Sequence, residues 1–472
     1  MLKKFENKLF RRNFLQVIST LFGATALNRN LFAQTNKPNI VFILADDLGY
    51  GDLSCYGQQD FNTPHIDSIA KDGLKFLQAY SNSASCTPTR VALITGRYQM
   101  RLKVGTEEPL QSDSPKDAGL SPEHPTMPGQ FKKIGYSTTL IGKWHLGDLP
   151  NFGPLKSGYD NFYGVFSGTT DYFKHDSKSS TPLYEQEVAI DRQGYITNLF
   201  GDRAVETINR HAQNKTPFFM SVHFNAPHYP WEGPNDEAES KRIKALIHRD
   251  GGNLKVFASM VQSMDENVGK ILKALSDKGL SDNTIVIFTS DNGGERFSRT
   301  WPFSGMKNEL LEGGLRIPSI IKWPGKISPD QTTQQVSISM DWMPTLLAAT
   351  GGFSDPAYPP DGENLLPQIL NTKTPIKERK LFWRFKVASQ RAIRDGDYKY
   401  LQIANNEFLF NVVEDQRERA NLKDRHKDIF DRLKNDWSNW NLSMLNERER
   451  PATFTNAGRG MADHYGVVNN PK

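Results

Sequence analysis

The stretch Asn39-Ile40-Val41-Phe42-Ile43-Leu44-Ala45, followed directly by Asp46-Asp47, is the clearest indication of the fold. An uninterrupted apolar run of this length is typical of a strand that is buried on both faces, as in a parallel sheet. The two aspartates place charge at the point where the strand ends. The stretch therefore predicts a central strand with a polar cluster at its carboxyl end.

Three more stretches repeat this pattern of an apolar run followed by a polar cluster. They are residues 137–141 before Lys143 and His145, residues 217–222 before His223 and His228, and residues 284–288 before Asp291 and Asn292. Helical patterns separate the runs, at 128–134, 198–212 and 257–276. This alternation predicts an α/β fold, with a large mixed, mainly parallel sheet sandwiched by helices. In such sheets the site lies beyond the carboxyl ends of the strands, which is where all four clusters fall.

The character of the chain changes after about Pro367. Residues 374–380 are charged and polar, like a linker. Residues 381–386, 391–402 and 407–411 then read as short antiparallel strands, and 424–440 as an amphipathic helix. We therefore expect a main α/β domain over residues 35–373, which carries the site, and a small C-terminal α+β subdomain with an antiparallel sheet over residues 374–472.

The net charge of +5 on this chain of 472 residues is concentrated at its beginning. Residues 1–34 contain six Lys or Arg and one Glu, so the remaining residues sum to zero. A neutral main domain gives no indication of a nucleic-acid partner.

Residues 1–33 read as an export signal. A basic start leads into Arg11-Arg12-Asn13-Phe14-Leu15 and then into a modest apolar stretch that reaches Leu27. The paired arginines resemble a twin-arginine signal, with Ala33 as a plausible cleavage point. An ordinary secretory signal and an uncleaved anchor are the alternatives. No later stretch is long and apolar enough to span a membrane, so we expect an exported protein that is periplasmic, secreted or at the cell surface.

Only two cysteines occur, Cys55 and Cys86, and the second lies in an unusual context. The run Cys86-Thr87-Pro88-Thr89-Arg90 is followed by an apolar stretch that reads as a helix. Arg90 would lie one helical turn after Cys86, and a helix N-terminus beside Cys86 would favour a bound anion. The alternative is an inert, buried thiol.

Asp46-Asp47 and Asp291-Asn292 together offer three carboxylates and one amide oxygen. Hard oxygen ligands suit Ca²⁺ or Mg²⁺ and do not suit zinc. Each pair alone would equally fit a helix cap or a turn. Because both pairs end buried apolar runs, a metal site is the favoured interpretation.

Four further side chains suit proton transfer or contact with a bound anion. Lys143 and His145 alternate around Trp144 as in extended chain, which would place both on one side. His228 stands in a loop between two prolines, where it suits a general acid. Lys307 suits a contact to the oxygens of a bound anion. The alternatives are a solvated loop for Lys143 and His145, and a surface position for Lys307.

Most of the chain resembles the type I sulfatases of the alkaline-phosphatase-like superfamily. The resemblance rests on the Cys-x-Pro-x-Arg run at Cys86 and on the blocks at 45–52, 142–147 and 394–399, in their order and rough spacing. It implies that a formylglycine-generating enzyme oxidises Cys86 to formylglycine, whose hydrate is the nucleophile. It also implies one Ca²⁺. The family usually has serine where Thr89 stands, which bears on how efficiently formylglycine is installed.

The resemblance also assigns roles residue by residue. The implied metal ligands are Asp46, Asp47, Cys86, Asp291 and Asn292. The implied catalytic residues are Cys86, Arg90, Lys143, His145, His228 and Lys307.

The expected function is an exported sulfatase that acts on sulfated carbohydrates. Aromatic and polar residues are mixed in residues 153–176, which should overhang the site and which suit sugar rings and hydroxyls. One alternative is a phosphomonoester or phosphonate-ester hydrolase of the same superfamily. The other is a carbohydrate-binding pseudo-sulfatase in which Cys86 is never oxidised.

Overall fold

The protein is described by a computed structural model that covers residues 37–111, 113–246 and 251–446. The predicted export signal at residues 1–33 lies outside the described residues. The four apolar runs form strands β1 (Asn39–Ala45), β4 (Ser137–Lys143), β8 (Phe218–His223) and β9 (Thr284–Ser290). The sequence located each of these strands to within two residues at either end.

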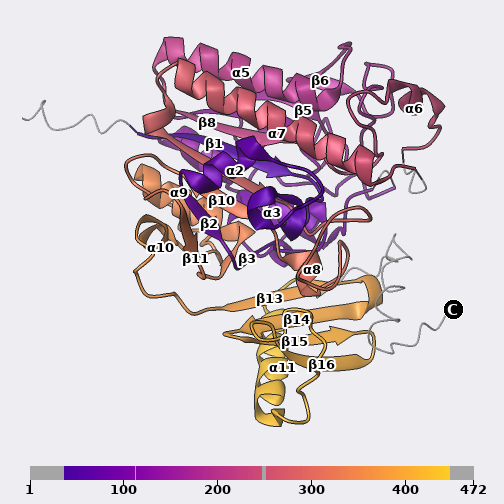
Figure 1. The fold of residues 1–472 in the computed structure, drawn as a ribbon, viewed down its shortest axis with the longest axis vertical. Helices are drawn as coiled ribbons and strands as arrows, with labels where there is room; N and C mark the ends of the chain where they lie inside the picture. The colour runs from indigo at the N-terminus through magenta and orange to yellow at the C-terminus, as the bar shows by residue number, and fades with distance from the viewer. Residues whose placement is uncertain (1–36, 112, 247–250, 447–472) are drawn as a thin grey trace, which may run out of the picture. The chain divides into compact units, whose positions relative to one another are not determined.

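These strands form the centre of a ten-stranded mixed sheet (Figure 1). Its order is β11 (Gln331–Thr333), β2 (Leu74–Phe76), β10 (Ser319–Lys322), β9, β1, β8, β4, β5 (Asn161–Val165), β6 (Leu183–Glu185) and β7 (Val188–Ile190). The neighbours from β9 to β5 all run parallel, whereas β10 and β6 flank them antiparallel. The mainly parallel sheet predicted from the sequence is confirmed.

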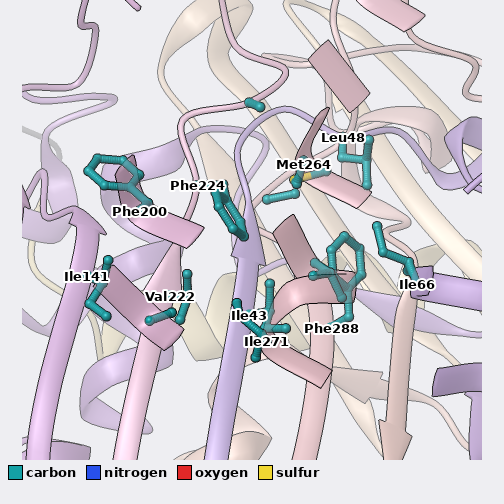
Figure 2. Packing of buried hydrophobic residues seen from close by; sticks show 14 of the residues in the cluster. Ile43, Leu48, Ile66, Ile141, Phe200, Val222, Phe224, Met264, Ile271 and Phe288 are labelled. Carbon is teal, nitrogen blue, oxygen red and sulfur yellow. The ribbon is translucent and has the colours of Figure 1, made fainter. Parts of the chain in front are cut away.

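Helices cover both faces of the sheet, as the side-chain alternation of β1 requires. Val41, Ile43 and Ala45 belong to the core shared with α2 (Pro64–Lys71), α5 (Ile196–Asn214) and α7 (Leu254–Asp277). Figure 2 shows Ile43 of this core near Ile271 of α7. Ile40, Phe42 and Leu44 point to the opposite core.

That opposite core contains residues of α3 (Cys86–Thr95), α4 (Met127–Lys133), α9 (Trp342–Thr350) and α10 (Leu366–Leu370). Phe42 is fully buried there and meets Trp342 edge-on, with ring centroids 6.1 Å apart. Truncating such a side chain to alanine typically costs about 3–5 kcal/mol. The two cores therefore fix the sheet from both sides, and with it the edge at which the polar clusters lie.

The antiparallel sheet near the C-terminus consists of β13 (Lys380–Phe385), β14 (Gln390–Asp395), β15 (Tyr398–Ile403) and β16 (Asn406–Asn411), in that order. A turn at Asp395-Gly396, with Gly396 at φ 58°, joins β14 to β15 as predicted. Helix α11 (Lys427–Leu442) packs Leu433 and Trp437 against one face of this sheet.

The other face of this sheet joins the main domain. Trp383 is fully buried, and its indole N–H donates to the carbonyl oxygen of Ser81 at 2.9 Å. The same core contains Tyr80 of the short strand β3 (Ala79–Tyr80), which pairs with β12 (Ser337–Ile338). Two short helices, α6 (Glu237–Arg242) and α8 (Glu312–Leu315), complete the α-helices of the described residues. None of the helices in the described ranges is both long and apolar enough to cross a membrane.

Candidate active site

The candidate site lies where the parallel strands end. Asp46 and Asp47 follow β1, Lys143 is the last residue of β4, and Asp291 follows β9. Because these strands are neighbours and run the same way, their carboxyl ends meet at one edge of the sheet. Helix α3 begins at Cys86 on this edge, and the side chains just named are all buried.

Two cations hold the carboxylates of Asp46 and Asp291. The Lys143 ammonium lies 2.5 Å from Asp46 Oδ2, and the Arg90 guanidinium lies 2.8 Å from Asp291 Oδ2. Arg90 also donates to the backbone carbonyl of Lys143 at 3.2 Å. Burial alone would lower the pKa of Arg90, but Asp291 and Asp46 raise it above its usual value. Arg90 is therefore a fixed positive charge.

A third cation holds Asp47. The Lys307 ammonium donates to Asp47 Oδ2 at 2.6 Å, and the Asn292 amide donates to Asp47 Oδ1 at 2.8 Å. Burial would raise the pKa of Asp47, but the charge of Lys307 outweighs it and lowers the pKa to about 2. Asp47 has a φ of 63°, a strained conformation of the kind that clusters at functional sites.

The predicted ligand set fits a hard divalent cation. One oxygen of Asp46 and the amide oxygen of Asn292 are buried and accept no hydrogen bond in the described part of the chain. Ligand atoms of Asp46, Cys86 and Asp291 all lie within 4.8 Å of one another. Burial, followed by the charge of Asp46, raises the pKa of Asp291 to about 7. A cation bound among these oxygens would relieve that repulsion and use the open acceptors.

Asp47 belongs to a second such group, with Asp46 and His228. His228 Nε2 lies 3.6 Å from Asp47 Oδ2, so this histidine faces the same carboxylates. The structure therefore brings together all the side chains that the sequence predicted as metal ligands.

Cys86 is buried at the first position of α3. Burial raises the pKa of its thiol, although Lys143 and Lys307 act in the opposite direction. Since the thiolate is the nucleophilic form of cysteine, this thiol is poorly suited to attack. The Thr89 hydroxyl bonds both the N–H and the carbonyl of Ser83 at 3.0 Å, and so fixes the segment before Cys86.

Two neutral histidines present a ring nitrogen to the site. His145 Nε2 donates to the Leu110 carbonyl at 3.0 Å, which leaves its buried Nδ1 without a partner among the described residues. His228 Nδ1 donates to the Tyr229 carbonyl at 2.6 Å, which leaves Nε2 toward Asp47. Burial lowers the pKa of both rings well below the usual value, with Lys143 and Lys307 respectively adding to the effect.

The extended alternation predicted across Lys143 and His145 ends earlier than expected. Strand β4 stops at Lys143, and His145 has a φ of 58°. The chain turns here because the two residues hold different partners: Asp46 for the Lys143 ammonium and Leu110 for the His145 ring.

The segment 153–176 lies against the site, but most of the aromatic rings that were expected to face a sugar are buried. The buried rings are those of Tyr159, Phe162, Tyr163, Phe166 and Tyr172. A Cβ added at Gly168 would meet the His145 ring at 2.3 Å, so only glycine allows this close approach. The Tyr172 hydroxyl donates to the His228 carbonyl at 2.8 Å. This segment therefore contacts both histidines of the site.

Two residues of the site neighbourhood were not assigned from the sequence. His223 ends β8, and its Nδ1 lies 3.2 Å from the Lys143 carbonyl and 3.5 Å from Arg90 Nη1. The sequence did offer one signal for His223, because this residue directly follows the apolar run 217–222. Buried Asp52 accepts hydrogen bonds from Gly49 N and Arg299 N, and so ties two loops of the site together. No pattern in the sequence links Asp52 to Arg299.

The family model for Sulfatase matches residues 38–352 of this chain. The chain belongs to the sulfatase family. It is 32% identical over 385 residues to N-acetylgalactosamine-6-sulfatase of Mus musculus, covering 77% of this chain and 71% of the relative. It is 33% identical over 403 residues to arylsulfatase A of Homo sapiens, covering 78% and 75%. These relatives make the chain a sulfuric ester hydrolase and confirm the family predicted from the sequence.

Solved structures agree with this membership. The crystal structure of Ps i-CgsB in complex with k-i-k-neocarrahexaose matches with a TM-score of 0.80 and 28% identity, covering 88% of this chain and 95% of that chain. A phosphonate monoester hydrolase of Agrobacterium radiobacter has the same fold, with a TM-score of 0.62 at 20% identity, covering 86% of this chain and 96% of that chain. The α/β fold with its C-terminal antiparallel sheet is therefore that of the sulfatases.

Proposed function

We propose that this sulfatase removes sulfate from sulfated carbohydrates, with Cys86 oxidised to formylglycine and one Ca²⁺ in the site. The observation that carries the proposal is the place of Cys86. It lies buried at a helix N-terminus, among three carboxylates that are already paired with Arg90, Lys143 and Lys307. These surroundings do not make the thiol a better nucleophile, because burial raises its pKa. Every positive charge in them would, however, stabilise a bound anionic ester.

Asp46, Asp47, Asp291 and Asn292 would hold the Ca²⁺, together with the modified side chain at position 86. The bound ion would supply positive charge for a sulfate oxygen. Support comes from the open acceptors on Asp46 and Asn292 and from the raised pKa of Asp291.

Oxidation would replace the poorly nucleophilic thiol with an aldehyde whose hydrate offers hydroxyl groups. In this proposal Arg90 keeps the carboxylates in place and helps to orient the side chain at position 86. The open Nδ1 of His145 accepts a proton from that side chain, because Leu110 already occupies Nε2. Lys143 and Lys307 hold the oxygens of the ester.

His228 would act as the general acid for the departing alcohol. Its Nδ1 is committed to the Tyr229 carbonyl, so Nε2 is the nitrogen that can carry the transferred proton. Burial and Lys307 hold its pKa low in the structure described, so the ring is neutral before substrate binds. The negative charge of a bound sulfate ester would raise the pKa of His228, so that Nε2 takes up a proton.

The substrate class and the location are inferred from three features. Two relatives bear on the substrate: one named N-acetylgalactosamine-6-sulfatase and one bound to an oligosaccharide, k-i-k-neocarrahexaose. The segment 153–176 lies against both site histidines. The basic leader with Arg11-Arg12 supports export, by the twin-arginine route, to the periplasm or beyond.

The test is desulfation by the whole protein, coexpressed with a formylglycine-generating enzyme. We expect release of sulfate from neocarrahexaose or N-acetylgalactosamine 6-sulfate, and much slower hydrolysis of a matched phosphate ester. Mass spectrometry of the peptide that contains Cys86 should show the aldehyde. Faster phosphate-ester hydrolysis would favour the phosphohydrolase alternative. An unmodified cysteine without turnover would favour the pseudo-sulfatase.

A further inference from the structure

The loop between Asn292 and Lys307 carries an exposed tryptophan. Both ends of this loop belong to the candidate site, because Asn292 and Lys307 each bind Asp47. Trp301 lies within the loop with 55% of its surface exposed. Since tryptophan is highly buried on average, an exposed tryptophan on a loop that starts and ends in the site needs an explanation.

The loop holds Trp301 on a firm base. The N–H of Arg299 donates to Asp52 at 2.7 Å, and the Arg299 carbonyl accepts from Gly51 N at 2.7 Å. Two residues after Trp301, the ring of Phe303 packs edge-on against Tyr50 at 4.8 Å. Trp301 is therefore presented beside the chain that follows Asp47, and its exposure is not a result of loose packing.

An arginine from the C-terminal subdomain lies on this tryptophan. The Arg417 guanidinium lies 5.2 Å from the centroid of the Trp301 ring. Ser304 Oγ donates to the Arg417 carbonyl at 2.9 Å. The next residue, Glu418, is fully buried and accepts from Lys399 Nζ at 2.9 Å. The position of Arg417 is thus fixed from both sides.

Among the residues that the structure describes, Arg417 has no acidic partner. No carboxylate of the described residues lies within 4.0 Å of its guanidinium, and its side chain is exposed. A guanidinium that stacks on a ring still presents its N–H groups in its own plane, where they match an oxyanion. The exposed part of the Trp301 ring can take the C–H face of a sugar.

We propose that Trp301 and Arg417 form a subsite for a sugar unit adjacent to the one that loses its sulfate. The unit stacks on Trp301, and Arg417 binds a second anionic group, a sulfate or a carboxylate, on the same oligosaccharide. This rests on the proposed function and deepens it. It makes the preferred substrate an oligosaccharide with more than one anionic group, rather than a single sulfated sugar.

The test compares substrates of two sizes with Trp301→Ala and Arg417→Ala. Each variant should raise KM for a multiply sulfated oligosaccharide such as neocarrahexaose by about tenfold, as loss of one aromatic or charged contact typically does. Their KM and kcat for 4-nitrophenyl sulfate, which cannot reach the subsite, should match those of the unsubstituted protein.

A second surface pair provides the matched control. Arg97 lies 5.7 Å from the ring of partly exposed Tyr358, beyond the C-terminal end of α3, whereas the site lies at its beginning. Tyr358→Ala should leave both substrates unaffected.

The outcomes separate the subsite from the proposed function. Unchanged oligosaccharide KM in both variants, with normal turnover by the unsubstituted protein, would overturn the subsite alone. Equal losses on both substrates would also overturn it, since the pair would then support the site itself. An unsubstituted protein that hydrolyses nitrophenyl sulfate but no sulfated saccharide would overturn the carbohydrate function and the subsite with it.

Discussion

Residues 307–312 connect two clusters of buried charge that differ in one respect. The site cluster gathers Asp46, Asp47 and Asp291 around Arg90, Lys143 and Lys307. The junction cluster lies where the C-terminal sheet meets the main domain. It comprises Tyr80, Glu312, Arg316, Arg394, Lys399 and Glu418, all buried.

The junction cluster is saturated with hydrogen bonds. Glu312 accepts from Tyr80, Arg316 and Lys399, at 2.6, 2.7 and 2.9 Å. Lys399 also donates to Glu418 at 2.9 Å, and the second oxygen of Glu418 accepts from the backbone N–H of Glu312 at 2.7 Å. No buried side-chain nitrogen or oxygen atom of this cluster is left without a partner within the described residues.

The site cluster also pairs buried carboxylates with buried cations, but it leaves acceptors open. Asp46 Oδ1, Asn292 Oδ1 and His145 Nδ1 are buried, and none of them has a hydrogen-bond partner in the described ranges. Burial of each such atom normally costs free energy, and three of them gathered beside one group of carboxylates mark a place where something else can bind. Buried charge alone is therefore weak evidence of function; buried charge with open acceptors is much stronger.

The largest effect should come from Cys86→Ala. Loss of the nucleophile should lower kcat/KM by about 10⁴-fold or more, with near-unchanged stability because the change removes one sulfur atom. Thermal unfolding and steady-state hydrolysis of 4-nitrophenyl sulfate measure the two quantities. Activity like that of the unsubstituted protein would show that the nucleophile lies elsewhere.

Metal removal should affect the site cluster and leave the junction cluster unchanged. A chelator should abolish turnover, and Ca²⁺ should restore it. Ca²⁺ should also raise the melting temperature, by mass action on the folded state, and Asp46→Asn should remove that response. As a control, Glu418→Gln at the junction should keep the Ca²⁺ response. Zinc in the purified, active protein would contradict the oxygen-ligand argument.

The strands and the site edge were predictable from the sequence because they depend on local patterns. Continuous apolar runs such as residues 39–45 mark buried parallel strands, and parallel strands bring their polar ends to one edge. Asp46, Lys143 and Asp291 could therefore be assigned together, although they lie far apart in the chain, whereas Cys86 and Arg90 were assigned from their own run and its resemblance to the sulfatases. The same logic located the hairpin turn at Asp395-Gly396.

The partners within that edge could not be predicted. Nothing in the sequence pairs Lys143 with Asp46 or Arg90 with Asp291, because such contacts depend on side-chain geometry across different strands. The turn at His145, with a positive φ, broke the expected alternation for the same reason. Lys399 lies in one of the blocks that carried the resemblance. Its buried partners Glu312 and Glu418 come from loops and a short helix without periodicity.

His228→Ala should separate two kinds of substrate. A sugar alcohol is a poor leaving group and needs a proton, whereas nitrophenolate barely does. General acid catalysis is typically worth about 10²–10⁴-fold, so turnover of a sulfated sugar should fall by that factor and turnover of nitrophenyl sulfate by much less. Equal losses would mean that His228 positions the ester beside Asp47, and the acid would then be Lys307 or another group.

Lys399→Met should have the smallest effect on chemistry and a clear effect on folding. The substitution leaves Glu312 and Glu418 buried without their shared cation, which typically costs about 3–5 kcal/mol, measurable by urea unfolding. The surface pair of Lys380 and Asp436, at 2.8 Å in the same sheet region, is the matched control, and Lys380→Met should cost less than about 1 kcal/mol.

Adding Glu418→Gln to Lys399→Met should recover part of the loss, because burial already raises the pKa of Glu418 to about 7. In the folded variant, kcat on nitrophenyl sulfate should stay within about twofold, since every atom of the site cluster keeps its partners. A large fall in kcat without loss of stability would show that the junction takes part in catalysis, and the contrast between the two clusters would no longer hold.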